Sequence, residues 1–139
     1  MCKNSITCVI IRVSNFGGDK MKQAKFKYCL KNADLLTEFD GDCYYYDDRK
    51  ILVFRELNGT QVFVDLNHSL LTRENDEMLL VLDFNSGNSC VEMKKMNKKI
   101  EMPTKINEKK VENNKFMVNY TLSENNNFEF VIEWDLGGE

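Results

Sequence analysis

The stretch ILVFRELNGTQVFVDL, residues 51–66, decides the fold class of this chain. Two runs rich in β-branched and aromatic residues flank Asn58 and Gly59, the pair that most readily accepts the two positive φ angles of a type I′ turn. We therefore predict a β-hairpin. The aromatic run at 42–46 and the polar segment at 47–50 add a third strand and a hairpin loop upstream, which gives a meander.

A second hairpin is predicted near the C-terminus, where two alternating segments are joined by a polar Ser-Glu-Asn-Asn-Asn connection. Residues 116–123 alternate between apolar and polar side chains. The period of two continues in the next segment, whose apolar positions are Phe128, Phe130, Ile132, Trp134 and Leu136. Both segments are typical of strands with one buried face.

Further strand patterns lie at 6–15 and 22–30, joined by the turn residues 17–19, and at 78–84 and 89–93. Helical patterns are short. Asn32 is placed to cap a turn or two of helix through residues 33–36. Met93, Met96 and Ile100 also fall at helical spacing.

About eight or nine strands without crossover helices predict an all-β fold, and we favour an antiparallel β-sandwich over a barrel. A C2-like or an immunoglobulin-like strand order fits this pattern. We expect one domain over residues 1–139, in which the lysine-rich segment at about 94–115 is a long loop between strands.

Composition fits an ordinary globular domain, with 42% hydrophobic residues and a formal net charge of −3. The five cysteines form no Cys-x-x-Cys pair and predict free thiols in a reducing compartment. The apolar run after residue 5 is closed by Arg12 before a signal-peptide core could form. We therefore expect an intracellular protein, cytoplasmic or nuclear.

Recognisable catalytic and cofactor motifs are missing from the sequence. The single histidine, His68, follows a hairpin in a polar segment and is expected to be a loop residue. The seven glycines form no phosphate-binding loop. Acidic residues between Asp34 and Asp48 match no EF-hand spacing and are expected to be solvated surface charge. No cofactor, metal or catalytic residue is predicted.

Tyr44, Tyr45 and Tyr46 stand in succession on a predicted strand, so the middle ring must face away from the outer two. Tyrosine is enriched in protein interfaces because it combines a large rigid area with a polar tip. A strand buried on both sides would explain the run equally well. The sequence fits both interpretations of the tyrosine run.

The lysine-rich segment carries seven lysines against Glu101 and Glu108 between residues 94 and 110, which is a local charge of +5. Such a segment can neutralise the phosphates of lipids or nucleic acids, although it contains no aromatic residue to stack on a base. The candidate residues are Lys94, Lys95, Lys98, Lys99, Lys105, Lys109 and Lys110.

These observations predict a non-catalytic domain that binds another protein, or a second copy of itself, through an exposed sheet face or an edge strand. Tyr44, Tyr45 and Tyr46 are the predicted interface. Binding of membrane lipid or nucleic acid through the lysine-rich segment is the first alternative. An enzyme without a recognisable motif is the second.

Overall fold

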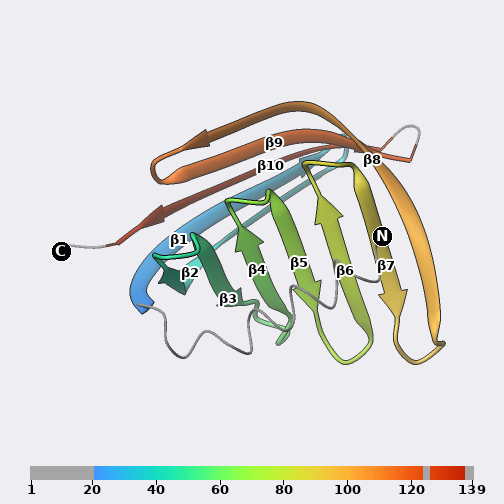
Figure 1. Ribbon diagram of the computed structural model, residues 1–139, viewed down its shortest axis with the longest axis horizontal. Coiled ribbons are helices and arrows are strands. Elements are labelled where there is room, and N and C mark those ends of the chain that lie inside the picture. Colours follow the sequence, from blue (N-terminus) through green and yellow to red (C-terminus); the bar gives the residue numbers. More distant parts are fainter. Residues whose placement is uncertain (1–20, 124–125, 137–139) are drawn as a thin grey trace.

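The computed structural model describes residues 21–123 and 126–136, and all its regular elements in these ranges are β-strands. Each strand pairs antiparallel with the next, and β1 pairs with β10, so that the sheet closes into a barrel (Figure 1). The strands are β1 Met21–Asn32, β2 Leu35–Tyr46, β3 Ile51–Arg55, β4 Gln61–Asp65, β5 Leu70–Glu74, β6 Met78–Asp83, β7 Asn88–Met93, β8 Lys98–Glu112, β9 Lys115–Leu122 and β10 Asn126–Asp135.

The barrel has two layers of unequal strand length. Short strands β3 to β7 lie side by side, while the longer β1, β2, β9 and β10 cross them at a steep angle (Figure 1). β8 belongs to both layers, because residues 98–103 pair with β7 and residues 104–112 pair with β9. On the other side only Tyr44, Tyr45 and Tyr46 of β2 pair with β3. β8 and the end of β2 therefore join the two layers at two corners. Between these corners, no strand pairing connects the layers in the described ranges.

The predicted sandwich is wrong, although the all-β class is confirmed. The observed fold is a closed antiparallel barrel, to which the described residues contribute ten strands. Closure depends on the pairing of β1 with β10, which places Phe26 opposite Trp134. These residues are far apart in sequence, and strand patterns that predict each strand separately contain no information about such a partner.

The predicted loop at 94–115 is mostly strand β8, and only its ends are turns. A bulge between Ile106 and Glu108 shifts the register, so the alternation of apolar residues changes phase within the strand. The predicted helical turns at 33–36 and around Met96 are also wrong. The first is a turn followed by β2, and the second is the turn between β7 and β8.

The predicted hairpin at 51–66 is confirmed as β3 and β4, but its turn is of another type. Gly59 has a φ of 90°, whereas Asn58 is not among the residues with positive φ. Gly59 N donates to Glu56 O and Glu56 N donates to Thr60 O, so the connection is a type I turn followed by a glycine bulge. The strand predicted at 6–15 and its turn lie outside the described residues.

Side chains on the inner faces of the strands fill the barrel unequally. Phe84, Phe116 and Ile132 are at most 1% exposed and form the filled part of the core. The other end of the interior is lined by inward apolar side chains that are only partly buried. These are Tyr28, Leu30, Phe39, Leu80, Met102, Ile106, Leu122 and Phe128. We call this end of the barrel the open end. In Figure 1 the β3–β4, β5–β6 and β7–β8 turns lie along the bottom, and the β1–β2 turn lies apart from them at the upper right.

No helix in the described ranges is long and apolar enough to cross a lipid bilayer.

Candidate functional site at the open end of the barrel

The open end contains a polar cluster of Tyr28, Glu56 and Arg73 among its apolar side chains. Arg73 Nη2 donates a 2.6 Å hydrogen bond to Glu56 Oε1, and Tyr28 Oη donates a 3.0 Å bond to Glu56 Oε2. The side chain of Glu56 is 12% exposed and that of Arg73 is 33% exposed. The ion pair is therefore largely removed from water. It connects the β3–β4 turn with β5, and the hydrogen bond from Tyr28 adds β1 to the cluster.

Strand alternation places these three residues inside the barrel. Glu56 follows the inward Leu52 and Phe54 at a period of two, and Arg73 follows the inward Leu71. Charged side chains at inward positions of a barrel are costly unless they are paired. Here Glu56 compensates Arg73, and Tyr28 satisfies the second carboxylate oxygen.

Arg73 retains hydrogen-bonding capacity that the described part of the protein does not use. A guanidinium has five N–H donors. Glu56 is the one acceptor found for Arg73 among the described residues, and the buried Nε atom has no partner there. The cluster can therefore donate further hydrogen bonds to a group that enters the open end.

Aromatic rings surround the cluster. The ring of Tyr28 lies 5.8 Å from that of Phe54, 5.9 Å from that of Phe39 and 5.7 Å from that of Phe130, measured between centroids. Burial, followed by the negative charge of Glu56 and the hydrogen bond to it, raises the pKa of Tyr28 to about 12. Burial raises the pKa of Tyr120 to about 12 as well, against the opposing charge of Arg73. Both phenols are neutral donors at physiological pH.

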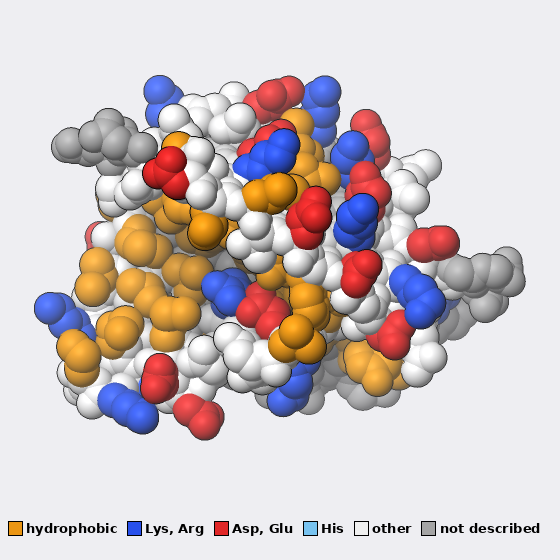
Figure 2. Space-filling model, turned by 180° about the vertical axis from the view of Figure 1, so that it is seen from behind, with side chains coloured by type: hydrophobic (Ala, Val, Ile, Leu, Met, Phe, Trp, Pro, Cys, Tyr) orange, Lys and Arg blue, Asp and Glu red, His pale blue; other side chains and the backbone are white. Residues whose placement is uncertain are grey.

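Exposed apolar side chains lie in or next to three turns of the barrel. Leu35 and Leu36 follow the β1–β2 turn, Leu57 lies in the β3–β4 turn and Met96 lies in the β7–β8 turn. They are 64%, 58%, 94% and 64% exposed. Figure 2 shows a broad group of hydrophobic side chains on one side of the molecule, bordered by a basic and an acidic side chain that lie close together. Such a surface is suited to an apolar ligand.

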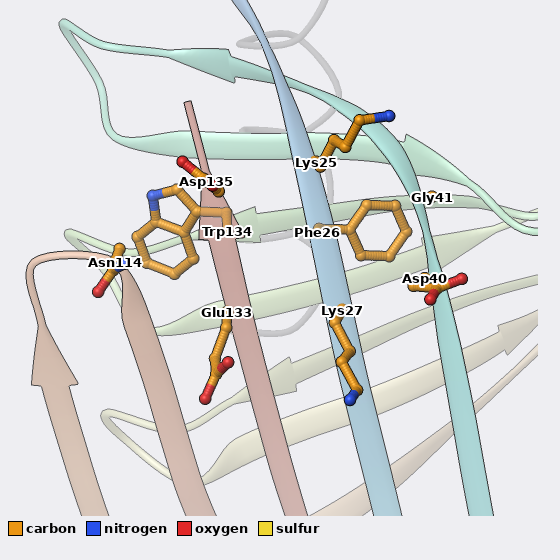
Figure 3. A pocket seen from close by; sticks show the side chains of 9 residues that line it. All are labelled: Lys25, Phe26, Lys27, Asp40, Gly41, Asn114, Glu133, Trp134 and Asp135. Carbon is orange, nitrogen blue, oxygen red and sulfur yellow. The ribbon is translucent and has the colours of Figure 1, made fainter. Parts of the chain in front are cut away.

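A depression of about 620 Å³ lies on the wall formed by β10, β1 and β2 (Figure 3). The ring of Phe26 points toward Gly41, whose missing side chain leaves space on the neighbouring strand. The rim combines Lys27 and Lys25 with carboxylates, and Lys25 Nζ lies 3.0 Å from Asp42 Oδ1 in a pair that is over 80% exposed on both sides. Exposed pairs of this kind contribute little to binding or stability.

The predicted tyrosine interface is divided by the barrel wall. Tyr45 is buried in the core, with its ring 6.2 Å from that of Trp134. Tyr46 is half-buried and packs on the outer face against a cluster that includes Phe63. Tyr44 is 43% exposed and is the one ring of the three that is available to a partner.

The seven predicted polyanion-binding lysines do not form one patch. Lys94 pairs with Glu74 at 2.8 Å, and Lys110 lies 3.8 Å from Glu108. Lys109 Nζ donates to Ser69 Oγ across the filled end of the barrel. Lys95 lies 3.9 Å from Glu77, while Lys98, Lys99 and Lys105 are exposed at separate positions of β8. Two of the seven lie in the β7–β8 turn, and the other five lie along β8, a strand of 15 residues.

His68 Nδ1 lies 3.0 Å from Asp65 Oδ2 at the β4–β5 turn. Asp65 also accepts a hydrogen bond from the backbone N–H of His68, so the contact organises the turn locally. No group of three or more His, Cys, Asp or Glu side chains in the described ranges is placed to hold a metal ion.

Tyr28, Glu56 and Arg73 were not predicted from the sequence as site residues. The sequence did contain a signal for an inward charge, because Glu56 continues the period-two pattern of inward residues in β3. It could be used only after β5 and its inward Arg73 had been identified, and the patterns described above do not identify β5.

Comparison with known proteins supports the fold and no more. No protein-family model matches the chain, and no match was found among curated protein sequences. The chain is similar to the crystal structure of the ywiB protein from Bacillus subtilis, with a TM-score of 0.51 and 14% sequence identity. The superposition covers 87% of this chain and 94% of that one. At this identity the similarity shows a shared fold alone.

Proposed function

We propose that this protein is a non-catalytic binding protein that takes up a small, largely apolar molecule at the open end of its barrel. The observation that carries the proposal is the Tyr28–Glu56–Arg73 cluster, which lies among partly buried apolar side chains. Within the described ranges, Arg73 has N–H donors in this cluster without an acceptor. Small-molecule sites typically combine an apolar lining with a few convergent polar groups, and barrel mouths are a frequent location for them.

The difference between the two ends of the barrel supports this proposal. Close packing at the filled end leaves Phe84 and Phe116 almost without solvent exposure. At the open end, by contrast, Leu30, Phe39 and Phe128 keep part of their surface accessible although they belong to the same core. A ligand that covered these side chains would remove apolar area from water, which contributes roughly 25 cal/mol per Å².

The test uses the uncharged fluorescent probe N-phenyl-1-naphthylamine and two variants of neighbouring residues on β1. Leu30 faces the open end, whereas Lys31 is exposed on the outer face. Leu30→Trp should reduce probe affinity by at least about tenfold because the indole occupies the site. Lys31→Trp adds the same side chain outside and should leave affinity unchanged.

Circular dichroism and thermal unfolding establish that both variants fold. Chemical-shift changes in backbone amide spectra should map probe contacts to the strand ends around the β3–β4 and β7–β8 turns. Equal affinity of the two folded tryptophan variants would contradict the proposal.

We also propose a second candidate function, protein binding along the edge of β2. Residues 35–43 of β2 pair with β1 on one side and have no strand partner on the other side among the described residues. Unpaired backbone groups on an edge accept an added strand. Glu38, Asp40 and Asp42 are exposed on the outer face of this edge, so an extended peptide with alternating apolar and basic residues would complement it.

Fluorescence anisotropy with two synthetic peptides tests this second candidate. Both alternate apolar with charged residues, and one carries lysine where the other carries glutamate. The lysine peptide should bind, and Asp40→Lys should weaken it several-fold. Tyr44→Ala should weaken it further if the exposed ring is part of the interface. Equal binding of both peptides would exclude an acidic edge as the determinant.

A further inference from the structure

The charge balance within the Tyr28–Glu56–Arg73 cluster indicates the chemical class of ligand. Arg73 contributes one positive charge and Glu56 one negative charge at 2.6 Å, while Tyr28 is neutral. The cluster is therefore neutral overall, although Arg73 still has N–H groups for which the described residues provide no acceptor. Glu56 lies so close to Arg73 that a second carboxylate at this guanidinium would be repelled.

We infer that the ligand is an uncharged amphipathic molecule whose polar group is a hydrogen-bond acceptor, such as the carbonyl of a ketone, ester or amide. This inference rests on the proposed function. The carbonyl oxygen accepts a hydrogen bond from the exposed part of the Arg73 guanidinium, and the hydrocarbon part lies against Phe39, Leu80 and Phe128.

Alternative head groups fit the cluster less well. An alkylammonium has donors and no acceptor, so it cannot use Arg73 and is repelled by its charge. A carboxylate can accept from Arg73 but must approach Glu56, whose side chain is only 12% exposed and is therefore weakly screened by water. A plain hydrocarbon would leave the donors of Arg73 without any acceptor.

Three ligands of similar chain length test this inference by displacement of N-phenyl-1-naphthylamine at pH 7.5: 2-undecanone, decanoate and decylammonium. We expect the ketone to bind at least about tenfold more tightly than either charged ligand. A tenfold difference corresponds to about 1.4 kcal/mol.

Glu56→Gln provides the decisive variant, because it keeps the shape and an acceptor oxygen for Arg73 while removing the compensating charge. It should raise decanoate affinity by at least about tenfold and reverse the preference between decanoate and the ketone. The double variant Glu56→Gln with Arg73→Met is again neutral but lacks the guanidinium. It should lose the ketone preference while retaining the naphthylamine probe, which also reports that its barrel is intact.

The outcomes separate the inference from the proposed function. If the naphthylamine probe binds but decanoate binds wild-type protein as tightly as the ketone does, the neutral-ligand inference is overturned and the proposed function stands. An unchanged preference in folded Glu56→Gln overturns it as well. If neither the probe nor any of the three ligands binds, the proposed function itself fails.

Discussion

Gly87, in the turn between β6 and β7, should be among the least replaceable residues of the barrel. Its φ is 83°, a region that L-residues with a Cβ rarely adopt. A Cβ at this position would lie 2.6 Å from the carbonyl oxygen of Thr104, which is backbone and cannot rotate away. Gly87 also accepts a 3.0 Å hydrogen bond from Thr104 N, so the same contact connects the turn to β8.

Gly59 offers a matched control. Its φ is 90°, but an added Cβ there would have no heavy atom within 4 Å. Gly59→Ala should therefore show the backbone strain alone, about 1–2 kcal/mol. Gly87→Ala should add the steric displacement of β8, a further 1–3 kcal/mol by comparison with overpacked cores, for a total of about 2–5 kcal/mol.

Equilibrium unfolding in urea, followed by tryptophan fluorescence, measures both free energies. Trp134 is the single tryptophan, and it is 4% exposed, so its emission should report loss of the core. Each kcal/mol corresponds to a fall in Tm of roughly 2–6 °C for a domain of this size. Equal destabilisation by the two substitutions would refute the close approach of Gly87 to β8 as a stability determinant.

Three further outcomes are expected. Tyr28→Phe should lower the free energy of unfolding by about 1–2 kcal/mol in urea titrations, because the inward carboxylate of Glu56 loses one donor. Absorbance at 295 nm should show Tyr28 and Tyr120 ionising near pH 12. Their folded pKa values exceed the unfolded value of 10, so the stability that these two tyrosines contribute should be complete below pH 10 and lost between pH 10 and 12. A fall in the urea midpoint of unfolding over this pH range would detect the loss. Cys43 is 2% exposed and burial raises its pKa to about 12, so at pH 8 its thiol should react with Ellman's reagent only after unfolding, as mass spectrometry of the adducts would establish.

The sequence was informative wherever a strand has one apolar face and a short turn to its neighbour. The hairpin of β3 and β4 and the hairpin of β9 and β10 were predictable because Val62 and Val64, or Phe130 and Ile132, recur at a period of two. The class of fold follows from such segments.

β5 and β8 were missed for a physical reason that also concealed the candidate site. In β5 the inward position after Leu71 is Arg73, so the apolar period ends after one residue. In β8 the bulge at Asn107 changes which residues face inward, from Ile106 before it to Lys109 after it. Pairing across space, such as that of Arg73 with Glu56, then compensates charges that look unfavourable in each strand alone.

Pairing of β1 with β10 has a consequence for how the chain reaches its native state. Of the ten strand pairings found in the part of the chain that the structure describes, nine join consecutive strands and can form locally as hairpins. The remaining one brings Lys25 opposite Asp135, across almost the whole described chain. The entropy of closing so long a loop must be lost before these contacts form. The pairing of β1 with β10 should therefore be the last to form during folding and should determine the folding rate.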